Sequence, residues 1–386
     1  MASSYERCRE GRALTRAGAS EPRSLRRLVL VGGGRAHLEL LRAFAQRVLR
    51  GVEIVLVAEE VQTFSSAMAV GLLRGVYALE DARIDVARLA ERAGVRLVTG
   101  RVSTIELGEQ IVVSGTNRVA FDACSLDVVG VPDEYAFRGV LHHALLLQHA
   151  STLPGARTTL YAWLADVGRR VNCVVVGGGT TGVEAAFAMQ HLLNHSKHGG
   201  LVTIVDSASG ILGDSPCRDP ARRALERIGV CFALGSRAVE ISSEAVLLSS
   251  GAALPADVAV WAAPGSPLAA IAASGLPHDA HGRLLVDAHL RARDGAPVWA
   301  AGQCAARSDA GERAVDESLV LERALRTALG ASSALALPRT AWSPCLLDTG
   351  DGRALVAWGA LHAHARWGWW LKQRRDRGFV AELAQA

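Results

Sequence analysis

The sequence predicts an α/β protein built from two units, each centred on a parallel sheet. An apolar run, a glycine cluster and a helical pattern occur in that order twice, and Gly177 of the second copy follows Gly32 of the first by 145 residues. A further apolar run, "VWAAGQCAA" at 298–306, follows the second copy. Buried parallel strands read as continuous apolar runs. The last run is therefore expected to be a short buried strand that stops at Gly302.

The first copy begins at residue 27. "RRLVLV" predicts a buried strand, the glycines at 32–34 a tight turn, and the following segment a helix, because its apolar residues recur at helical spacing. "VEIVLVAEE" predicts the next strand, which ends at Glu59 and Glu60. At the third position of the glycine fingerprint the chain has His37 instead of glycine.

The second copy is complete. "VNCVVVGGGTTGVEAAFAMQHLL" predicts a strand, a turn with Gly177, Gly179 and Gly182, and a helix, and "LVTIVD" predicts a strand that ends at Asp206. In such a turn the first glycine allows a tight bend and the second lets the main chain approach a pyrophosphate. The third lets the helix pack closely on the strand, and the helix N-terminus faces the negative charge.

Each copy therefore predicts a Rossmann-like dinucleotide-binding fold. The acid at the end of the second strand can accept hydrogen bonds from a ribose diol. Asp206 would repel a 2′-phosphate, and no arginine follows it closely in "DSASGIL". This favours NAD(H) over NADP(H) at the second site, and the first site is left to hold a hydride acceptor.

Composition narrows the class of protein. Lysine and arginine number 42 against 38 acidic residues in 386, and only the last thirty residues are a basic stretch with aromatic residues, so no nucleic-acid partner is expected. Seven cysteines without a C-x-x-C motif favour a reducing, cytoplasmic compartment. Residues 1–26 are rich in arginine and lack the apolar core of a secretory signal, so we expect a flexible extension.

Two histidine pairs are of the right type for metal ligands. His142 and His143 are adjacent, and His191 and His195 have helical spacing. A zinc site needs further ligands that the sequence does not supply, so no metal is expected.

The C-terminal stretch "HAHARWGWWLKQRRDRGF" combines tryptophans with arginines and one lysine. A basic amphipathic helix of this kind can lie at a membrane interface. It can equally cap the fold with a solvated basic face, and the sequence leaves both interpretations open.

The two nested fingerprints, together with "VWAAGQCA", resemble the FAD-dependent pyridine nucleotide-disulfide oxidoreductase superfamily. "LVLVGGGRAHLELLR" and the C-terminal "LLDTGDGRALVAWG" and "RWGWWLKQRRDRGF" resemble a narrower group. This group is the type II NADH dehydrogenase-like flavoproteins, including those fused to selenide, water dikinase. The resemblance covers residues 27 to about 381.

The resemblance implies a domain organisation. A discontinuous FAD-binding domain would comprise residues 27–138 and 262–337, and an inserted NAD(P)-binding domain residues 139–261. Residues 338–386 would pack on the FAD domain and form dimer or peripheral membrane contacts.

It also implies cofactor-binding positions. The residues expected at FAD are Gly32, Gly34, Arg35, His37, Glu59, Ser66, Val102, Gly302, Gln303 and Glu317. Those expected at NAD(H) are Gly177, Gly179, Thr181, Gly182, Glu184 and Asp206.

Some of these positions carry alternatives. Glu184 is expected near the nicotinamide, or it stabilises the helix N-terminus, which favours an acid by about 0.3–1 kcal/mol. His37 contacts the pyrophosphate or caps a tightly packed helix start. Cys304 has no basic neighbour or partner cysteine in the sequence and is expected to be an inert thiol. No catalytic residue is assigned, because hydride transfer needs no side-chain acid or base.

Departures from the family pattern fall on the flavin side. Gly302-Gln303 replaces a usual Gly-Asp pair whose carboxylate accepts a hydrogen bond from the ribityl chain. The stretch 65–71 differs from a "YSGMLPG"-like segment, Asp316-Glu317 replaces a basic-then-amide pair, and 128–130 reads Val-Val-Gly.

The predicted function is an FAD-dependent oxidoreductase that takes hydride from NADH. Its electrons would pass to a quinone, a small molecule or a partner protein. The alternatives are a dinucleotide-binding sensor or inactive partner subunit with a degraded flavin site, and a specialised flavoenzyme of secondary or selenium metabolism. The departures on the flavin side motivate them.

Overall fold

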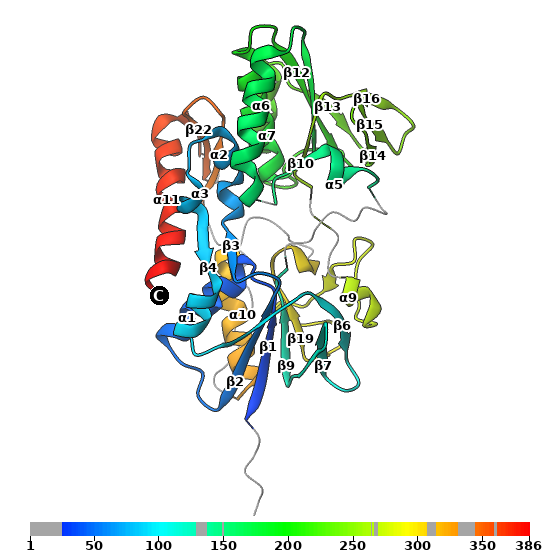
Figure 1. The fold of residues 1–386 in the computed structure, drawn as a ribbon. Helices are drawn as coiled ribbons and strands as arrows, with labels where there is room; N and C mark the ends of the chain where they lie inside the picture. Colours follow the sequence, from blue (N-terminus) through cyan, green and yellow to red (C-terminus); the bar gives the residue numbers. More distant parts are fainter. Residues whose placement is uncertain are drawn as a thin grey trace, which may run out of the picture.

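The computed structural model describes residues 25–128, 137–148, 150–263, 265, 269–306, 314–330, 344–358 and 361–386. The extension predicted at 1–26 lies outside these ranges except for its last two residues. Within them the chain forms two lobes, each with a parallel sheet at its centre, and the C-terminal segment lies along one side of both lobes (Figure 1). The predicted α/β class with parallel sheets is confirmed.

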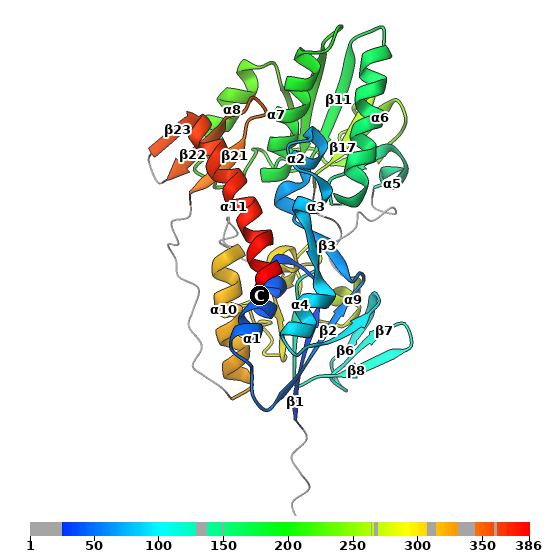
Figure 2. The ribbon, with the colours of Figure 1, turned by 60° about the vertical axis from the view of Figure 1, so that its left-hand side comes forward.

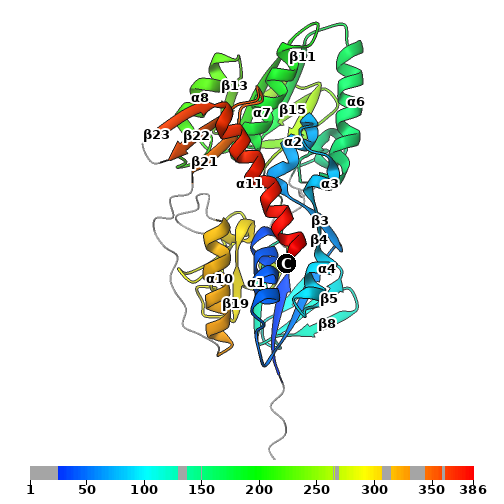
Figure 3. The same ribbon diagram turned by 90° about the vertical axis from the view of Figure 1, so that its left-hand side faces the viewer.

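The sheet of the first lobe has the strand order β19-β9-β1-β2-β5, and all neighbours are parallel. Its strands are β1 (Arg26–Val31), β2 (Val52–Ala58), β5 (Arg96–Thr99), β9 (Ala123–Leu126) and β19 (Val298–Ala300). The "VWA" run at 298–300 thus pairs with β9, as expected of a strand that returns to the first unit. Helices α1 (Arg35–Gln46) and α10 (Ala314–Ala328) lie side by side in this lobe (Figures 2 and 3).

The sheet of the second lobe has the order β10-β17-β11-β12-β13 and is also parallel. Its strands are β10 (Ala144–Leu146), β11 (Val171–Val176), β12 (Gly200–Asp206), β13 (Cys231–Leu234) and β17 (Val258–Trp261). Its helices are α6 (Leu153–Asp166), α7 (Thr180–Asn194) and α8 (Arg218–Arg227). Helix α7 is buried along most of its length, since small and apolar residues cover nearly its whole circumference.

Short elements connect and cover these sheets. The first lobe carries β3 (Gln62–Phe64) paired with β4 (Arg83–Asp85), the antiparallel strands β6 (Val102–Glu106), β7 (Ile111–Ser114) and β8 (Asn117–Ala120), and β18 (Leu284–Leu285) paired with β20 (Ala305–Ala306). The second carries β14 (Ala238–Ile241), β15 (Ala245–Leu248) and β16 (Ala253–Pro255). The remaining short helices are α2 (Ala69–Arg74), α3 (Leu79–Ala82), α4 (Val86–Arg92), α5 (Val140–His143) and α9 (Ala269–Ala273), with 3-10 turns η1 (Ser66–Met68), η2 (Ala150–Thr152) and η3 (Gly302–Cys304).

The C-terminal segment lies partly where it was not expected. Its antiparallel strands β21 (Cys345–Asp348), β22 (Ala354–Trp358) and β23 (Leu361–Ala365) lie beside α7 and α8 of the second lobe, so the expectation that the segment packs on the FAD domain is wrong for this sheet (Figures 2 and 3). Helix α11 (Arg366–Gln385) then crosses to the first lobe, where its last turns lie near α1 and β4. The segment therefore ties the two lobes together.

The tail helix α11 buries one side and exposes another. Lys372 and Asp376 are buried, whereas Trp367 and Trp370 are more than half exposed. Among the described residues, no helix combines the length and the apolar character that a membrane crossing requires.

Candidate functional site

A cleft with a volume of about 230 Å³ opens at the first glycine turn. It lies between the start of α1, the β3–η1 connection, the start of α6 and the last turns of α11. Three residues predicted at FAD, Gly34, Arg35 and Ser66, line it. Its wall comprises Gly33, Gly34, Arg35, Leu38, Glu60, Thr63, Phe64, Ser65, Ser66, Ala67, Ile84, Gln148, Ser151, Thr152 and Phe379.

The start of α1 has unused hydrogen-bond donors. Its first N–H groups have no partner inside the helix, and those of Arg35 and Ala36 have none elsewhere among the described residues. The buried Nε of Arg35 also lacks a partner there. Buried donors are normally paired, and a helix N-terminus favours negative charge. These donors therefore fit an anionic group such as the pyrophosphate of a dinucleotide.

Asp127 directly follows β9 and lies between the glycine turn after β1 and the turn after β19. Its buried carboxylate accepts a hydrogen bond from the N–H of His37 (3.1 Å), and its carbonyl accepts one from the N–H of Gly34 (2.9 Å). A Cβ added at Gly34 would lie 2.2 Å from this carboxylate, and one at Gly302 would lie 2.7 Å from it. Both glycines are thus required by the protein's own packing.

The ring of His37 faces the sheet. Its Nδ1 lies 2.7 Å from the carbonyl oxygen of Gly32 and its Nε2 lies 2.8 Å from Oγ of Ser125. Burial lowers the pKa of His37, so the ring is neutral. A carbonyl can only accept, so Nδ1 donates to Gly32 and Nε2 accepts from the Ser125 hydroxyl. Both ring nitrogens are therefore bonded within the protein, and the expectation that this ring contacts the pyrophosphate is wrong. The alternative, that His37 belongs to a tightly packed helix start, fits the structure.

The two acids that follow β2 lie in different surroundings. Glu60 lines the cleft, whereas Glu59 is half exposed and lies 3.6 Å from Nε of Arg101. Val102, expected beside the adenine, is buried in β6 opposite Ser114 and does not line the cleft.

The turn after β19 binds a second carboxylate. Gly302 has a φ of +58° and donates its N–H to Oε2 of Glu317 (2.9 Å), the first residue of α10 whose side chain the structure describes. Gln303 is exposed on this turn. Cys304 is buried, with its sulfur in contact with the N–H and the carbonyl of Val128, and burial raises the pKa of its thiol to about 12. This thiol is therefore not poised as a nucleophile.

The second glycine turn is more open. Gly177 has a φ of +115°, and a Cβ at Gly182 would overlap the Gly177 carbonyl, so both glycines serve the tight turn and its packing. A Cβ at Gly179 would meet no atom within 4 Å, and Thr181 beside it is partly exposed. Here the start of the helix faces open space.

Asp206 reaches back to this turn. Its carboxylate accepts the N–H of Gly178 (2.5 Å) and that of Ala208 (2.7 Å). These contacts fix an anionic carboxylate at the carboxyl end of β12, beside the open start of α7.

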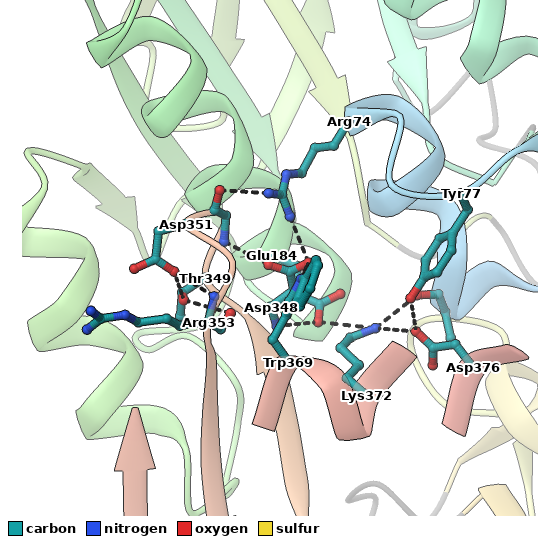
Figure 4. A network of polar contacts seen from close by, with 12 residues as sticks. Arg74, Tyr77, Glu184, Asp348, Thr349, Asp351, Arg353, Trp369, Lys372 and Asp376 are labelled. Atoms are coloured by element: carbon teal, nitrogen blue, oxygen red, sulfur yellow. Dashed lines mark hydrogen bonds and ion pairs between the residues drawn. The ribbon is translucent and has the colours of Figure 1, made fainter. Parts of the chain in front are cut away.

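Glu184 belongs to a buried network that the sequence did not predict (Figure 4). Its carboxylate accepts the main-chain N–H of Asp348 (2.8 Å) and lies 3.6 Å from Nζ of Lys372. Burial raises the pKa of Glu184 to about 7 although the nearby ammonium lowers it. The side chain is covered by the C-terminal segment.

The same network includes residues from the segment between β3 and β4, whose helix α2 packs against α6 and α7. Arg74 at the end of α2 binds the carboxylate of Asp348 (2.7 Å), and Tyr77 donates its hydroxyl to Asp376 (3.0 Å) (Figure 4). Lys372 also donates to Asp376 (2.8 Å) and to the carbonyl of Ala67 in the cleft wall (3.2 Å). The network thus joins α7, α2 and α11 and contacts the cleft wall at Ala67.

Several site residues were not found from the sequence. Asp127 directly follows the buried strand β9, which is the same signal that identifies Asp206 at the end of β12. Gln148, whose buried Oε1 has no partner among the described residues, and Phe379 carry no local signal. Val129, Gly130 and the side chain of Asp316 lie outside the described residues.

The histidine pairs do not gather further ligands. In each pair the rings lie about 6.5 Å apart, and Nδ1 of His195 bonds the carbonyl of His191. Over the ranges that the structure describes, no group of three or more His, Cys, Asp or Glu residues could hold a metal ion.

Sequence comparison finds a family match over most of the chain. A model of the pyridine nucleotide-disulphide oxidoreductase family matches residues 26–328. An internal alternative NAD(P)H-ubiquinone oxidoreductase of Arabidopsis thaliana mitochondria is 26% identical over 222 residues, 52% of this chain and 43% of that protein. The assimilatory nitrate reductase electron transfer subunit of Bacillus subtilis is 25% identical over 268 residues, 64% of this chain and 32% of that protein. The chain thus spans less than half the length of these relatives.

Solved structures share the fold over nearly the whole chain. The sulfide:quinone oxidoreductase of Aquifex aeolicus superposes with a TM-score of 0.77 at 13% identity, covering 93% of this chain and 92% of the other. NDH2 of Plasmodium falciparum, in complex with NADH, gives a TM-score of 0.65 at 10% identity, covering 94% and 98%. At these identities the likeness establishes the fold alone.

Proposed function

The chain belongs to the pyridine nucleotide-disulphide oxidoreductase family, and on this premise we propose that it is an FAD-dependent oxidoreductase that takes hydride from NADH. The observation that carries the proposal is the pair of glycine turns. Each precedes a helix at the carboxyl end of a parallel sheet, and each helix start offers free space or free donors to a dinucleotide. The cofactors of this proposal are FAD at the first turn and NAD(H) at the second.

The residues of the first lobe would hold FAD. When bound, this group supplies the hydride-accepting and electron-donating chemistry. The protein's part is to bind and orient it: Arg35 and the first N–H groups of α1 meet the pyrophosphate, and Glu60 is the acid at the end of β2 that lines the cleft. Ser66 and Ala67 form the wall next to the C-terminal network.

The second lobe would hold NADH. Gly179 leaves room for a pyrophosphate at the start of α7, and the anionic Asp206 disfavours a 2′-phosphate. No side chain of the chain need act as an acid or base for the hydride step. Cysteine chemistry plays no part in the proposal, since the thiol of Cys304 is buried and of raised pKa.

The electron acceptor is proposed as a quinone, a small molecule or a protein. The names of the relatives support this range: one is a ubiquinone oxidoreductase and another an electron transfer subunit. Because the chain spans less than half the length of each relative, the electron acceptor of neither relative can be assigned directly to this chain.

A spectrum tests the proposal. Purified protein, reconstituted with FAD if needed, should absorb near the flavin band at about 450 nm, and NADH should bleach this band anaerobically. A protein that takes up FAD but is not reduced by NADH, or that takes up none, would contradict it.

A second function has one observation in its favour. Glu317 accepts the N–H of Gly302 (2.9 Å), so the turn after β19 donates this N–H to the protein's own carboxylate and not to a cofactor. A dinucleotide-binding sensor or inactive partner subunit would keep the second site and lose the first. Tight NADH binding by a colourless protein that cannot be reconstituted would select this alternative.

A further inference from the structure

We infer that Arg375, on the C-terminal helix, completes the phosphate site at the first glycine turn together with Arg35. The inference rests on the proposed function and adds a binding residue from outside the part of the chain that matches the family. The ligand class is a diphosphate, as in the pyrophosphate of a dinucleotide.

The position of Arg375 on α11 follows from its neighbours. Lys372, three residues before it, bonds the carbonyl of Ala67 in the cleft wall, and Phe379, four residues after it, lines the cleft. Residues three and four apart lie on one face of a helix. Arg375 therefore lies beside the face of α11 that is turned toward the cleft; its side chain is exposed and is not one of the residues that line the cleft.

Arg35 lies next to the same face. Its guanidinium carbon is 4.2 Å from the centre of the Phe379 ring, and burial, followed by the charge of Arg375, lowers the pKa of Arg35. Two guanidinium groups are thus close enough to repel each other at the start of α1, where the helix end is itself positive.

The charges of Glu39 and Asp376 offset part of this repulsion, but both carboxylates are hydrogen-bonded to other side chains. Glu39 binds Arg42 (2.8 Å), and Asp376 binds Lys372 and the hydroxyl of Tyr77. Like charges held together beside an unpartnered buried Nε are relieved when an anion bridges them. A diphosphate offers one phosphate to each guanidinium and its remaining oxygens to the N–H groups of Arg35 and Ala36.

The consequence is a link between cofactor binding and the C-terminal segment. Helix α11 is fixed at its other end by the Glu184 network of the second lobe. A phosphate bound by both arginines would fix α11 at the first lobe as well, and so hold the two lobes in one arrangement.

The test compares two arginines of α11 in the full chain. Arg375→Ala should weaken FAD binding by about tenfold, the loss expected for one charged hydrogen bond. Arg374→Ala is the matched control, since Arg374 is adjacent and equally exposed, and its guanidinium carbon lies 5.6 Å from the centre of the ring of the exposed Trp370. Affinities are measured by titrating the apoprotein with FAD and following flavin fluorescence.

Riboflavin has no phosphate, so its affinity distinguishes a direct contact between Arg375 and phosphate from a structural effect of the substitution on the site. If Arg375 meets a phosphate, Arg375→Ala leaves riboflavin affinity unchanged while FAD affinity falls. An equal loss for both ligands, or FAD affinity equal to that of Arg374→Ala, would overturn the inference. Should the alanine variant not fold, Arg375→Gln keeps most of the side chain and carries the same expectations.

The outcome for the wild-type chain keeps the two proposals apart. Wild-type protein that binds FAD and is bleached by NADH, with no effect of Arg375→Ala, leaves the proposed function standing and removes the role of Arg375. Wild-type protein that takes up no FAD overturns both.

Discussion

Nζ of Lys372 lies 3.6 Å from a carboxylate oxygen of Glu184, so one buried ammonium joins the first turns of α7 to the C-terminal helix. Burial by itself lowers the pKa of Lys372, but the carboxylates of Glu184 and Asp376 outweigh it and raise the pKa above its usual value. Lys372 is therefore charged at neutral pH. Glu184, with a pKa of about 7, changes its protonation in the physiological range.

The raised pKa of Glu184 predicts a pH-dependent cost to stability. In the unfolded chain a glutamate releases its proton near pH 4.3, whereas in the folded protein Glu184 keeps it up to about pH 7. Between these values the folded state holds the extra proton, so the contribution of Glu184 to the free energy of unfolding falls as pH rises, and it levels off above the folded pKa.

Glu184→Gln removes this titration and keeps an acceptor for the N–H of Asp348. The free energy of unfolding of the wild type minus that of the variant should therefore fall between about pH 5 and pH 7 and then stay level. Urea unfolding at several pH values measures it. A difference that is constant across this range would show that Glu184 titrates normally.

Removing the ammonium should be costly in a pH-dependent way. Lys372→Met leaves two buried carboxylates without their cation, and breaking a buried ion pair costs about 3–5 kcal/mol. The loss should be largest near pH 8 and smaller near pH 5, where Glu184 is neutral in the folded protein.

The chain offers one matched control for this substitution. Its other lysine, Lys197, is exposed, so Lys197→Met should change the free energy of unfolding by less than about 0.5 kcal/mol. Equal effects of the two substitutions on urea unfolding would contradict a structural role for the buried ion pair.

The sequence predicted the two βαβ units because their signals are local. In each, the apolar run, the glycine turn and the helix lie within some thirty residues, and the two strands that flank the helix pair with each other. Asp206 illustrates this, since it bonds Gly178 in the turn from which its fingerprint spacing was read.

His37 and Glu184 show where such reasoning stops. The ring of His37 is directed by Ser125, 88 residues away, and the carboxylate of Glu184 by Asp348, 164 residues away. Neither partner belongs to the glycine fingerprint, and no spacing rule connects them. The side-chain roles of these two residues therefore depend on tertiary packing, although their positions at helix starts were predicted correctly.

The two glycine turns predict opposite responses to the same substitution. In Gly34→Ala the new Cβ would lie 2.2 Å from the Asp127 carboxylate, so the side chain of Asp127 must move and its bond to the N–H of His37 weakens. Overpacking of this kind costs about 1–3 kcal/mol. We expect a lower melting temperature for the protein without any ligand, and rescue in Gly34→Ala/Asp127→Ala.

Gly179→Ala is the counterpart. Its Cβ would meet no atom within 4 Å and its φ is −73°, so the ligand-free protein should melt as the wild type does. NADH binding should weaken, because the methyl group occupies the space where the main chain approaches the dinucleotide. A lower melting temperature for Gly179→Ala would contradict the open second turn. An unchanged melting temperature for Gly34→Ala would contradict the first turn that Asp127 fills.

Asp206 should decide between NADH and NADPH by its charge. Its two carboxylate oxygens bind the N–H groups of Gly178 and Ala208, which hold the anion at the end of β12. A 2′-phosphate placed beside it would add like charge, whereas a ribose hydroxyl can donate to it. Asp206→Asn removes the charge and keeps one acceptor oxygen, so the preference for NADH over NADPH should fall by about tenfold, which corresponds to 1.4 kcal/mol. Dissociation constants for both nucleotides, measured by quenching of protein fluorescence, give this ratio.

Asp166→Asn is the control, because Asp166 is an exposed acid at the end of α6. It precedes the amino end of β11 and thus lies at the opposite edge of the same sheet. If the two substitutions shift the ratio equally, the effect is one of net charge on the lobe; if only Asp206→Asn shifts it, the carboxylate acts at the ribose.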